Sequence, residues 1–295
     1  MSAVPMVATP PRLLVTGATG HVGREAVAAA RRLGVPVTAA VRDPARSASP
    51  DDVRAVAFDF RDRATWPAAL DGHTRLFLMR PPAIADARAT LDPLVDAART
   101  RGIAHIAFLS VAGAERNRFL PHRRTEDHLR RDGRSDFTVL RPGFFAQNLE
   151  SAYRDDIVAD DRIYVPAGRA PVNWIDAADI GEVAARVLVD PAAHRGAAYT
   201  LCGPGPVEWD AVAATLGEVL HRRIRYVPAS VPGYVRHLHR RGLARDAIAV
   251  QTVLHVLLRF GQGARTDPTL ARLLGRPGRS VHDYIRANVP RWARR

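Results

Sequence analysis

Three glycines spaced three residues apart, directly after a short apolar run, constrain the fold of this chain more than any other feature. Residues 13–15 form the apolar run, Gly17, Gly20 and Gly23 carry the spacing, and a helical pattern covers residues 22–33. Gly17 permits a tight turn, Gly20 lets a pyrophosphate approach the backbone, and Gly23 lets the helix pack closely on the strand. Since a helix N-terminus also offers unpaired N–H groups to phosphates, the segment predicts a dinucleotide site. The alternative is a tight strand-to-helix connection that binds nothing. The contacts expected in this turn are Gly17, Thr19, Gly20, His21, Val22 and Gly23.

Strand and helix patterns alternate along the first half of the chain. Apolar strands are expected at residues 35–41, 53–58, 75–79, 106–109 and 137–140, and helices at 83–101 and 121–131. This alternation predicts an α/β fold with a doubly wound, parallel Rossmann sheet. Beyond Arg141 the pattern is less regular and indicates a smaller C-terminal α+β substrate lobe. Its expected elements are helices at 176–189 and 207–220, a strand at 199–201, and helical segments within 228–260, 267–274 and 281–289.

Length and composition are consistent with one compact protein. With 295 residues and 47% hydrophobic content, the chain can bury one large core. We expect an NAD(P)-binding Rossmann domain over residues 1–145 and a mainly helical substrate lobe over residues 146–295, sharing the same core. No apolar run reaches the ~20 residues of a membrane span, and the first 11 residues do not resemble a signal peptide. A cytoplasmic protein without a membrane partner is therefore expected.

The basic residues are exclusively arginine. All 43 are Arg, and the net charge is +13. Classical short-chain reductases use Tyr-x-x-x-Lys, in which the lysine lowers the pKa of the tyrosine, so that dyad is impossible here. Because acidic residues are interleaved with the arginines and no nucleic-acid motif is present, a solvated surface is favoured over nucleic-acid binding. Cys202 is the only cysteine, so an intramolecular disulfide and a cysteine-clustered zinc site are excluded, and no metal is expected.

The residue that ends the second strand indicates which dinucleotide binds. An acidic residue there would accept hydrogen bonds from the ribose hydroxyls, whereas an arginine would pair with a 2′-phosphate. This chain has Arg42, and the following Asp43 is expected to cap a turn. NADP(H) is therefore predicted over NAD(H). Asp59, after the third strand, is a candidate for the adenine side or a turn-capping carboxylate.

The carboxyl ends of the fourth and fifth strands are expected to face the nicotinamide half, because ligands in open α/β sheets lie there. Met79 and Arg80 follow from the fourth strand as cofactor contacts. Ser110 ends the fifth strand and is a candidate catalytic residue that would touch the cofactor or orient the substrate. The alternative is that its hydroxyl only forms a turn.

The chain resembles the NmrA-like branch of the atypical short-chain dehydrogenase/reductases, which includes NADPH-dependent quinone reductases and redox-sensing regulators. The glycine spacing itself resembles the extended and atypical families. The segments that carry the resemblance are residues 16–23, 122–129, 138–148, 174–180 and 199–204.

In this family the tyrosine of the dyad can be lost. Here the corresponding position holds His122, and Glu126 stands where the lysine would be. His122, with a reference pKa of about 6.5, is a candidate general acid, and the alternative is a local hydrogen-bonding role. Glu126 is expected to support its helix or bind an arginine.

The resemblance further implies that the segment after residue 141 contacts the nicotinamide and the mouth of the substrate cleft. Pro142 and Phe144 are expected at the cofactor, with one aromatic of the Phe144-Phe145 pair pointing into the core. The substrate contacts expected are Phe145, Asn148, Tyr153 and Trp174, with lobe packing as the alternative for the last two.

Loss of the dyad favours particular acceptors. Hydride addition to a ketone yields an alkoxide, which needs strong stabilisation, whereas a quinone yields a phenolate-like oxygen that water can protonate. The sequence thus predicts an NADPH-dependent oxidoreductase acting on an aromatic, quinone-like or polycyclic carbonyl compound. One alternative is a non-catalytic NADP(H)-binding redox sensor. Another is an epimerase, a cyclase, or an enone or imine reductase. A monomer or homodimer is expected.

Overall fold

The computed structural model describes residues 11–47, 49–81, 84 and 86–294. The chain divides into two compact units. The first contains residues up to 141 together with 180–199, and the second contains residues 142–179 and 200–295. The division thus lies at residue 141 rather than at 145, and residues 180–199 belong to the first unit instead of the C-terminal lobe.

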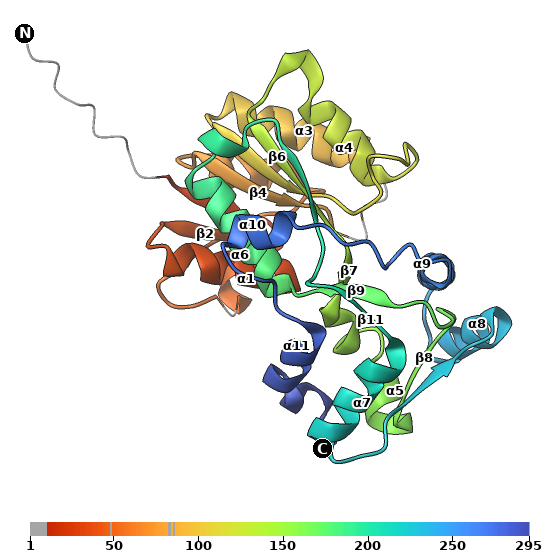
Figure 1. The fold of residues 1–295 in the computed structure, drawn as a ribbon. Coiled ribbons are helices and arrows are strands. Elements are labelled where there is room, and N and C mark those ends of the chain that lie inside the picture. The colour runs from red at the N-terminus through yellow and green to blue at the C-terminus, as the bar shows by residue number, and fades with distance from the viewer. Residues whose placement is uncertain (1–10, 48, 82–83, 85, 295) are drawn as a thin grey trace, which may run out of the picture. The chain divides into compact units, whose positions relative to one another are not determined.

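The first unit is built on a seven-stranded sheet with the strand order β10-β6-β5-β4-β1-β2-β3 (Figure 1). Its neighbouring strands from β3 to β6 pair in parallel. The expected doubly wound Rossmann sheet is therefore confirmed. The strands are β1 (Leu13–Val15), β2 (Val37–Val41), β3 (Arg54–Ala57), β4 (Arg75–Met79), β5 (His105–Leu109), β6 (Phe137–Pro142) and β10 (Ala198–Leu201).

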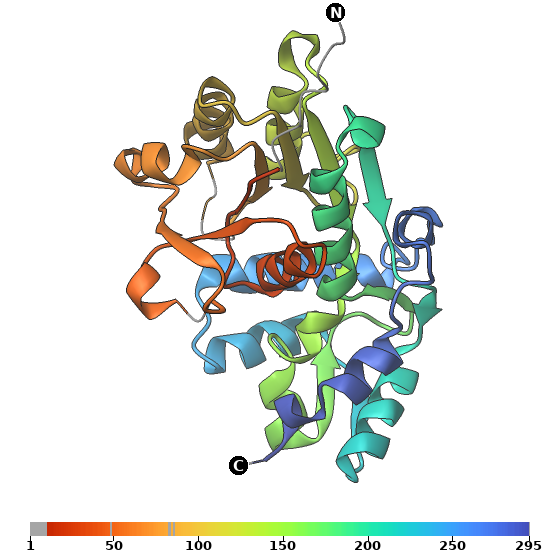
Figure 2. The same cartoon turned by 90° about the vertical axis from the view of Figure 1, so that its left-hand side faces the viewer.

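Helices cover both faces of this sheet. Figures 1 and 2 show α1 and α6 on one face and α3 and α4 on the other. The helices α1 and α6 are in close contact, since a Cβ added at Gly181 would lie 2.5 Å from the carbonyl carbon of Glu25. The central strands are buried between these layers except for one half-buried end residue each, as their near-continuous apolar sequence requires. The helices are α1 (His21–Arg32), α2 (Trp66–Leu70), α3 (Ala87–Thr100), α4 (Pro121–Leu129) and α6 (Ala177–Val189).

The second unit contains two small sheets, of strand order β11-β9-β7 and β12-β8. Its core is rich in aromatic residues, including the buried side chains of Trp174, Trp209 and Trp292. Its strands are β7 (Phe144–Phe145), β8 (Arg162–Val165), β9 (Val172–Ile175), β11 (Pro206–Val207) and β12 (Arg225–Pro228). Its helices are α5 (Arg154–Asp160), α7 (Trp209–Leu220), α8 (Val231–Arg240), α9 (Arg245–Arg259), α10 (Thr269–Leu274) and α11 (Val281–Ala287).

Several elements differ from the sequence expectation. The helix expected from residue 83 begins at Ala87, and residues 82, 83 and 85 lie outside the described residues. The segment 228–260 forms two helices, α8 and α9. The sequence analysis expected none of the short strands of the second unit, which are β7, β8, β9, β11 and β12. Short 3₁₀ helices lie at Pro44–Arg46, Arg63–Thr65, Arg131–Gly133, Ala146–Leu149, Ala192–His194 and Val289–Trp292. Across the described ranges, no helix is both long enough and apolar enough to cross a membrane.

Candidate functional site

The glycine turn between β1 and α1 has the geometry of a dinucleotide cradle. Gly17 has φ +59°, a left-handed conformation that favours glycine. A Cβ at Gly23 would lie 2.1 Å from the carbonyl oxygen of Gly17, so only glycine fits there. Gly20 precedes the helix, and the N-terminus of α1 has no side-chain cap and no acidic residue in its first turn. Its N–H groups are thus available to an anion, and the residues present fit a pyrophosphate.

Thr16, which the sequence analysis did not single out, fixes this turn to the neighbouring strand. Its buried hydroxyl donates to the carbonyl oxygen of Phe77 and accepts from the N–H of Met79, both at 3.0 Å. The Met79 side chain packs against the turn, where a Cβ at Gly17 would lie 2.9 Å from its Cε. A threonine at the end of an apolar strand is the sequence signal that could have identified this role.

The end of β2 presents Arg42 to solvent. Its side chain is exposed and has no hydrogen bond or ion pair among the described residues. Asp43 caps the following 3₁₀ helix, because its carboxylate accepts from the N–H of Ala45 at 3.0 Å. Asp59 accepts from the N–H of Arg61 at 2.8 Å, which is the turn-capping role. Of these three side chains, only Arg42 is left uncommitted.

Arg80, directly after β4, forms hydrogen bonds both with its own loop and with His122. The guanidinium donates to the carbonyl oxygens of Pro81 and Ile84, and its Nε donates to Nε2 of His122 at 3.3 Å. Burial and then the charge of Arg80 lower the pKa of His122 to about 4. The pKa of His122 thus lies below the reference value of about 6.5, and the imidazole is neutral at neutral pH with its Nε2 already accepting a hydrogen bond.

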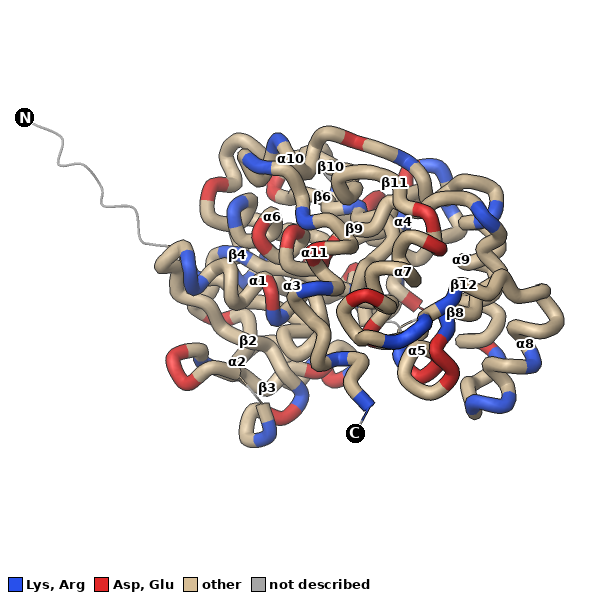
Figure 3. Tube along the Cα trace, turned by 60° about the horizontal axis from the view of Figure 1, so that its bottom comes forward, with Lys and Arg blue, Asp and Glu red and all other residues tan. Residues whose placement is uncertain are grey.

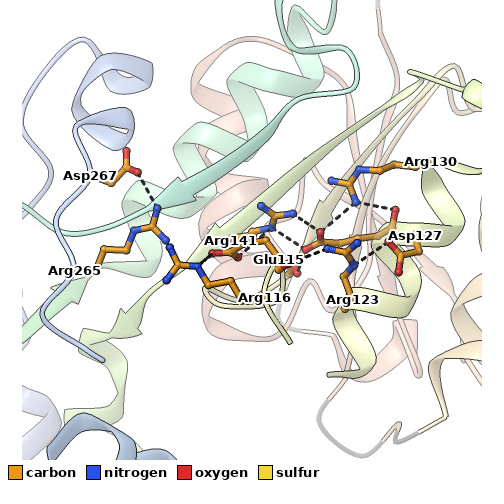
Figure 4. Close-up of polar contacts among 10 residues, drawn as sticks. Glu115, Arg116, Arg123, Asp127, Arg130, Arg141, Arg265 and Asp267 are labelled. Carbon is orange, nitrogen blue, oxygen red and sulfur yellow. Dashed lines mark hydrogen bonds and ion pairs between the residues drawn. The ribbon is translucent and has the colours of Figure 1, made fainter. Parts of the chain in front are cut away.

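A buried charge cluster occupies the place of the missing dyad. Glu126 is fully buried on α4, and Arg141 at the end of β6 donates to both of its carboxylate oxygens, with Nε at 2.9 Å and Nη2 at 2.5 Å. Arg130, directly after α4, adds a contact at 3.3 Å, and Figure 4 shows the side chains of Arg130 and Arg141 in this cluster. The predicted arginine pairing of Glu126 is confirmed.

Ser110 belongs to the same cluster. Its buried hydroxyl donates to Oε1 of Glu126 at 2.6 Å. Burial raises the pKa of Glu126, but the hydrogen bonds from Arg141 and Ser110 and the charges of Arg141 and Arg130 outweigh it, so the pKa is lowered. The carboxylate is thus ionised at neutral pH, and the proton of Ser110 is committed to it.

In the second unit, Phe144 packs on an aromatic cluster. Its ring centroid lies 5.1 Å from that of Trp174, and Trp174 is 1% exposed. Tyr153 is 2% exposed, and its hydroxyl forms a hydrogen bond with Nε2 of His255. Tyr153 and Trp174, expected at the substrate, are therefore core residues of this unit, as the packing alternative stated. Phe145 and Asn148 are half-buried, and Pro142 is buried at the end of β6.

Figure 3 shows basic and acidic positions interspersed along the elements of both units. Among the residues that the structure describes, no group of three or more His, Cys, Asp or Glu side chains could hold a metal ion.

Comparison with known proteins decides the family. A model of the NAD(P)H-binding family matches residues 17–191, more than half of the chain. The chain belongs to the NAD(P)H-binding family. The NAD(P)H azoreductase of Xenophilus azovorans is 30% identical over 285 residues, which cover 94% of this chain and 98% of the azoreductase.

Several solved structures share the fold. Triphenylmethane reductase from Citrobacter sp. matches with a TM-score of 0.82 and 22% identity, covering 95% of this chain and 99% of the reductase. The NADPH-dependent quinone oxidoreductase of Escherichia coli, solved with NADPH, matches with a TM-score of 0.81 and 24% identity, covering 92% and 98%. NmrA, a negative transcriptional regulator, matches with a TM-score of 0.71 and 18% identity, covering 96% of each chain. The predicted NAD(P)-binding family and the class of NAD(P)H-dependent oxidoreductase are confirmed, and the fold is shared with NmrA.

Proposed function

We propose that this protein is an NADPH-dependent reductase of quinone-like or polycyclic carbonyl compounds that works without a Tyr-Lys dyad. The observation that carries the proposal is the absence of an available acidic proton among the described side chains that follow β4 and β5. The hydroxyl of Ser110 donates to the Glu126 carboxylate, and His122 is neutral with Nε2 already accepting from Arg80. With Ser110 and His122 committed in this way, the site suits acceptors whose reduction needs no strong acid.

The cofactor supplies a hydride when it is bound. The hydride delivers two electrons and one proton to a quinone. The product carries a phenolate-like oxygen, whose protonated form has a pKa of about 10. Water can give it the second proton and so complete the hydroquinone. A simple ketone would instead yield an alkoxide, which requires a stronger acid than the neutral imidazole of His122 or the Ser110 hydroxyl that already donates to Glu126.

The residues of this chain bind the cofactor and orient the reactants. The N–H groups of α1 and the turn at Gly17 bind the pyrophosphate. Arg42 pairs with the 2′-phosphate, which explains an exposed guanidinium left without a partner in the described part of the chain. Arg80 fixes the loop after β4, and the cluster around Glu126 fixes the end of β5. Catalysis would then rest on the alignment of nicotinamide and acceptor.

The proposal is tested by the loss of NADPH absorbance when the purified protein meets quinones and polycyclic ketones, with NADH in parallel. Turnover with quinones, faster with NADPH than with NADH, is expected. Turnover of simple ketones at comparable rates would contradict the proposed lack of a proton donor.

Removal of the Arg42 guanidinium is expected to reduce the preference for NADPH. In Arg42→Ala, the dissociation constant of NADPH should rise about tenfold or more, because a charge-assisted pair with phosphate is lost. The NADH constant should stay within about twofold, since that cofactor has no 2′-phosphate. Fluorescence titration of both cofactors measures the two values. An unchanged affinity for NADPH would overturn the role of Arg42.

The rate of quinone reduction is expected to show no titration of His122 between about pH 6 and 8. A pKa of about 4 keeps this imidazole neutral across that range. For the same reason His122→Gln should retain the rate within about threefold, because a neutral side chain replaces a neutral one. A pH-rate profile of both proteins with one quinone measures this. A wild-type inflection near pH 6.5 that disappears in the variant would restore the general-acid role.

A second candidate function is a redox sensor that binds NADP(H) without catalysis. The observation in its favour is the same commitment of Ser110 and His122 to other side chains, which leaves binding intact and removes proton transfer. Tight NADPH binding with no turnover of any acceptor would favour the sensor over the reductase.

A further inference from the structure

The loop between β5 and α4, residues 111–120, holds an aromatic ring in solvent beside arginine side chains. Phe119 is 76% exposed, the largest exposed fraction among the large apolar side chains that the structure describes. The guanidinium carbon of Arg118 lies 5.3 Å from the centre of this ring. The Arg116 side chain is 81% exposed. A flat apolar surface and positive charge are thus presented together.

The loop's own hydrogen bonds hold this arrangement. The N–H groups of Arg116 and Asn117 both donate to the carbonyl oxygen of Gly113 at 3.1 Å, and Leu120 N–H donates to the carbonyl oxygen of Asn117 at 3.2 Å. The side-chain oxygen of Asn117 accepts from the N–H of Phe119 at 3.0 Å. The backbone that carries the exposed ring is therefore held by a hydrogen-bonded turn, and little backbone order would be lost when a ligand covers the ring.

The positive charge of the loop is largely unpaired. Arg118 has no acidic partner in the described part of the chain, and Arg116 reaches Glu115 only at 4.0 Å. Glu115 also lies 3.8 Å from Arg141, so its carboxylate is shared. An added anion would meet two accessible guanidinium groups, which bind carboxylate, sulfonate or phosphate oxygens through paired N–H donors.

The position of the loop connects it to the chemistry. It begins directly after Ser110, at the carboxyl end of β5, and β5 is separated from the glycine-turn strand β1 only by β4. Ligands of open α/β sheets lie beyond this edge. A side chain of Arg123 on α4 donates to the carbonyl oxygen of Glu115 at 3.1 Å and anchors the loop there.

We infer that this loop selects acceptors that carry an anionic group on a flat ring. The ring of the acceptor packs on Phe119, and its carboxylate, sulfonate or phosphate pairs with Arg116 or Arg118. The inference rests on the proposed reductase function and narrows its substrate class. It predicts that a negative charge on the acceptor lowers its KM, although hydride transfer itself does not require that charge.

The test compares one neutral and one anionic quinone, menadione and naphthoquinone sulfonate, in wild type and in Arg116→Gln/Arg118→Gln. For the sulfonate, the KM should rise about tenfold or more in the double variant while kcat changes little, because the charge contacts position the acceptor and take no part in the reaction. For menadione, both values should stay within about twofold. Phe119→Ala should raise the KM for both quinones.

The matched control is Arg223→Gln/Arg225→Gln, which removes the same charge from two exposed positions of the second unit. It should leave both quinones unaffected. An equal loss for the two quinones in the loop variant, or an equal loss for the sulfonate in the control, would overturn the inference.

A binding measurement separates this inference from the reductase proposal. Calorimetry with naphthalene sulfonate on the NADP-loaded protein requires no turnover. If wild type reduces neither quinone but binds the sulfonate about tenfold more tightly than the loop variant does, the reductase proposal fails and the anion site stands. If wild type and variant bind it equally, the anion site fails whatever the turnover.

Discussion

Replacement of Gly23 by alanine is expected to abolish NADPH binding at usable concentrations. The added Cβ would lie 2.1 Å from the carbonyl oxygen of Gly17 and 2.8 Å from the Cα of Ala18, and both are backbone atoms. The turn must open to admit it, which moves the first N–H groups of α1 away from the pyrophosphate. We expect the NADPH dissociation constant to rise at least about 100-fold, or about 3 kcal/mol of binding free energy. Titration of NADPH fluorescence measures it.

The control for this variant is Gly205→Ala. Gly205 has no left-handed φ, and an added Cβ would meet nothing within 4 Å, so NADPH affinity should be unchanged. Because Gly23→Ala can also destabilise the first unit, its melting temperature is measured alongside. Gly20→Ala gives a milder test, since its Cβ would lie 3.3 Å from the carbonyl oxygen of Gly17. A folded Gly23→Ala protein that binds NADPH within threefold of wild type would contradict the cradle.

The sheet of the first unit was predictable because its inner strands are buried on both faces. Strands such as Leu76 to Met79 are continuous apolar runs, and the helices between them have clear apolar stripes. The strands of the second unit lack that signal. In β8, buried and half-buried residues alternate over only four positions, and its parallel partner β12 is 63 residues further along the chain, from Arg162 to Arg225. A pairing so short and so distant leaves no local pattern to detect.

The candidate site was predictable where the chemistry is local. The glycine spacing, the exposed Arg42 and the capping role of Asp43 all depend on neighbours within a few residues. Contacts between distant side chains were not predictable in the same way. The pKa of His122 depends on burial and on Arg80, which is 42 residues away. A residue type can therefore suggest a proton donor, but its surroundings decide whether the proton is available.

Loss of the Glu126 charge is expected to destabilise the first unit strongly. In Glu126→Gln, the Arg141 guanidinium, whose side chain is 11% exposed, loses its bidentate partner and keeps only the weaker contact with Glu115 at 3.8 Å. Breaking such a pair costs about 3 kcal/mol or more of unfolding free energy. Denaturant titration measures it. Asp127→Asn is the matched control, because it breaks a more exposed i,i+4 pair with Arg123 on the same helix and should cost less than about 0.5 kcal/mol.

The pH dependence of this effect follows from the direction of the pKa shift. The pKa of Glu126 is lower in the folded protein than its ordinary value of 4.5, so the unfolded chain takes up the proton more readily. The stabilisation is therefore fully present above pH 4.5 and is lost as the pH falls through the folded pKa. The free-energy difference between wild type and Glu126→Gln should shrink in acid, where wild type also loses the charge. A difference that stays constant from about pH 7 to the onset of acid unfolding would show that Arg141 is stabilised by groups other than the Glu126 carboxylate.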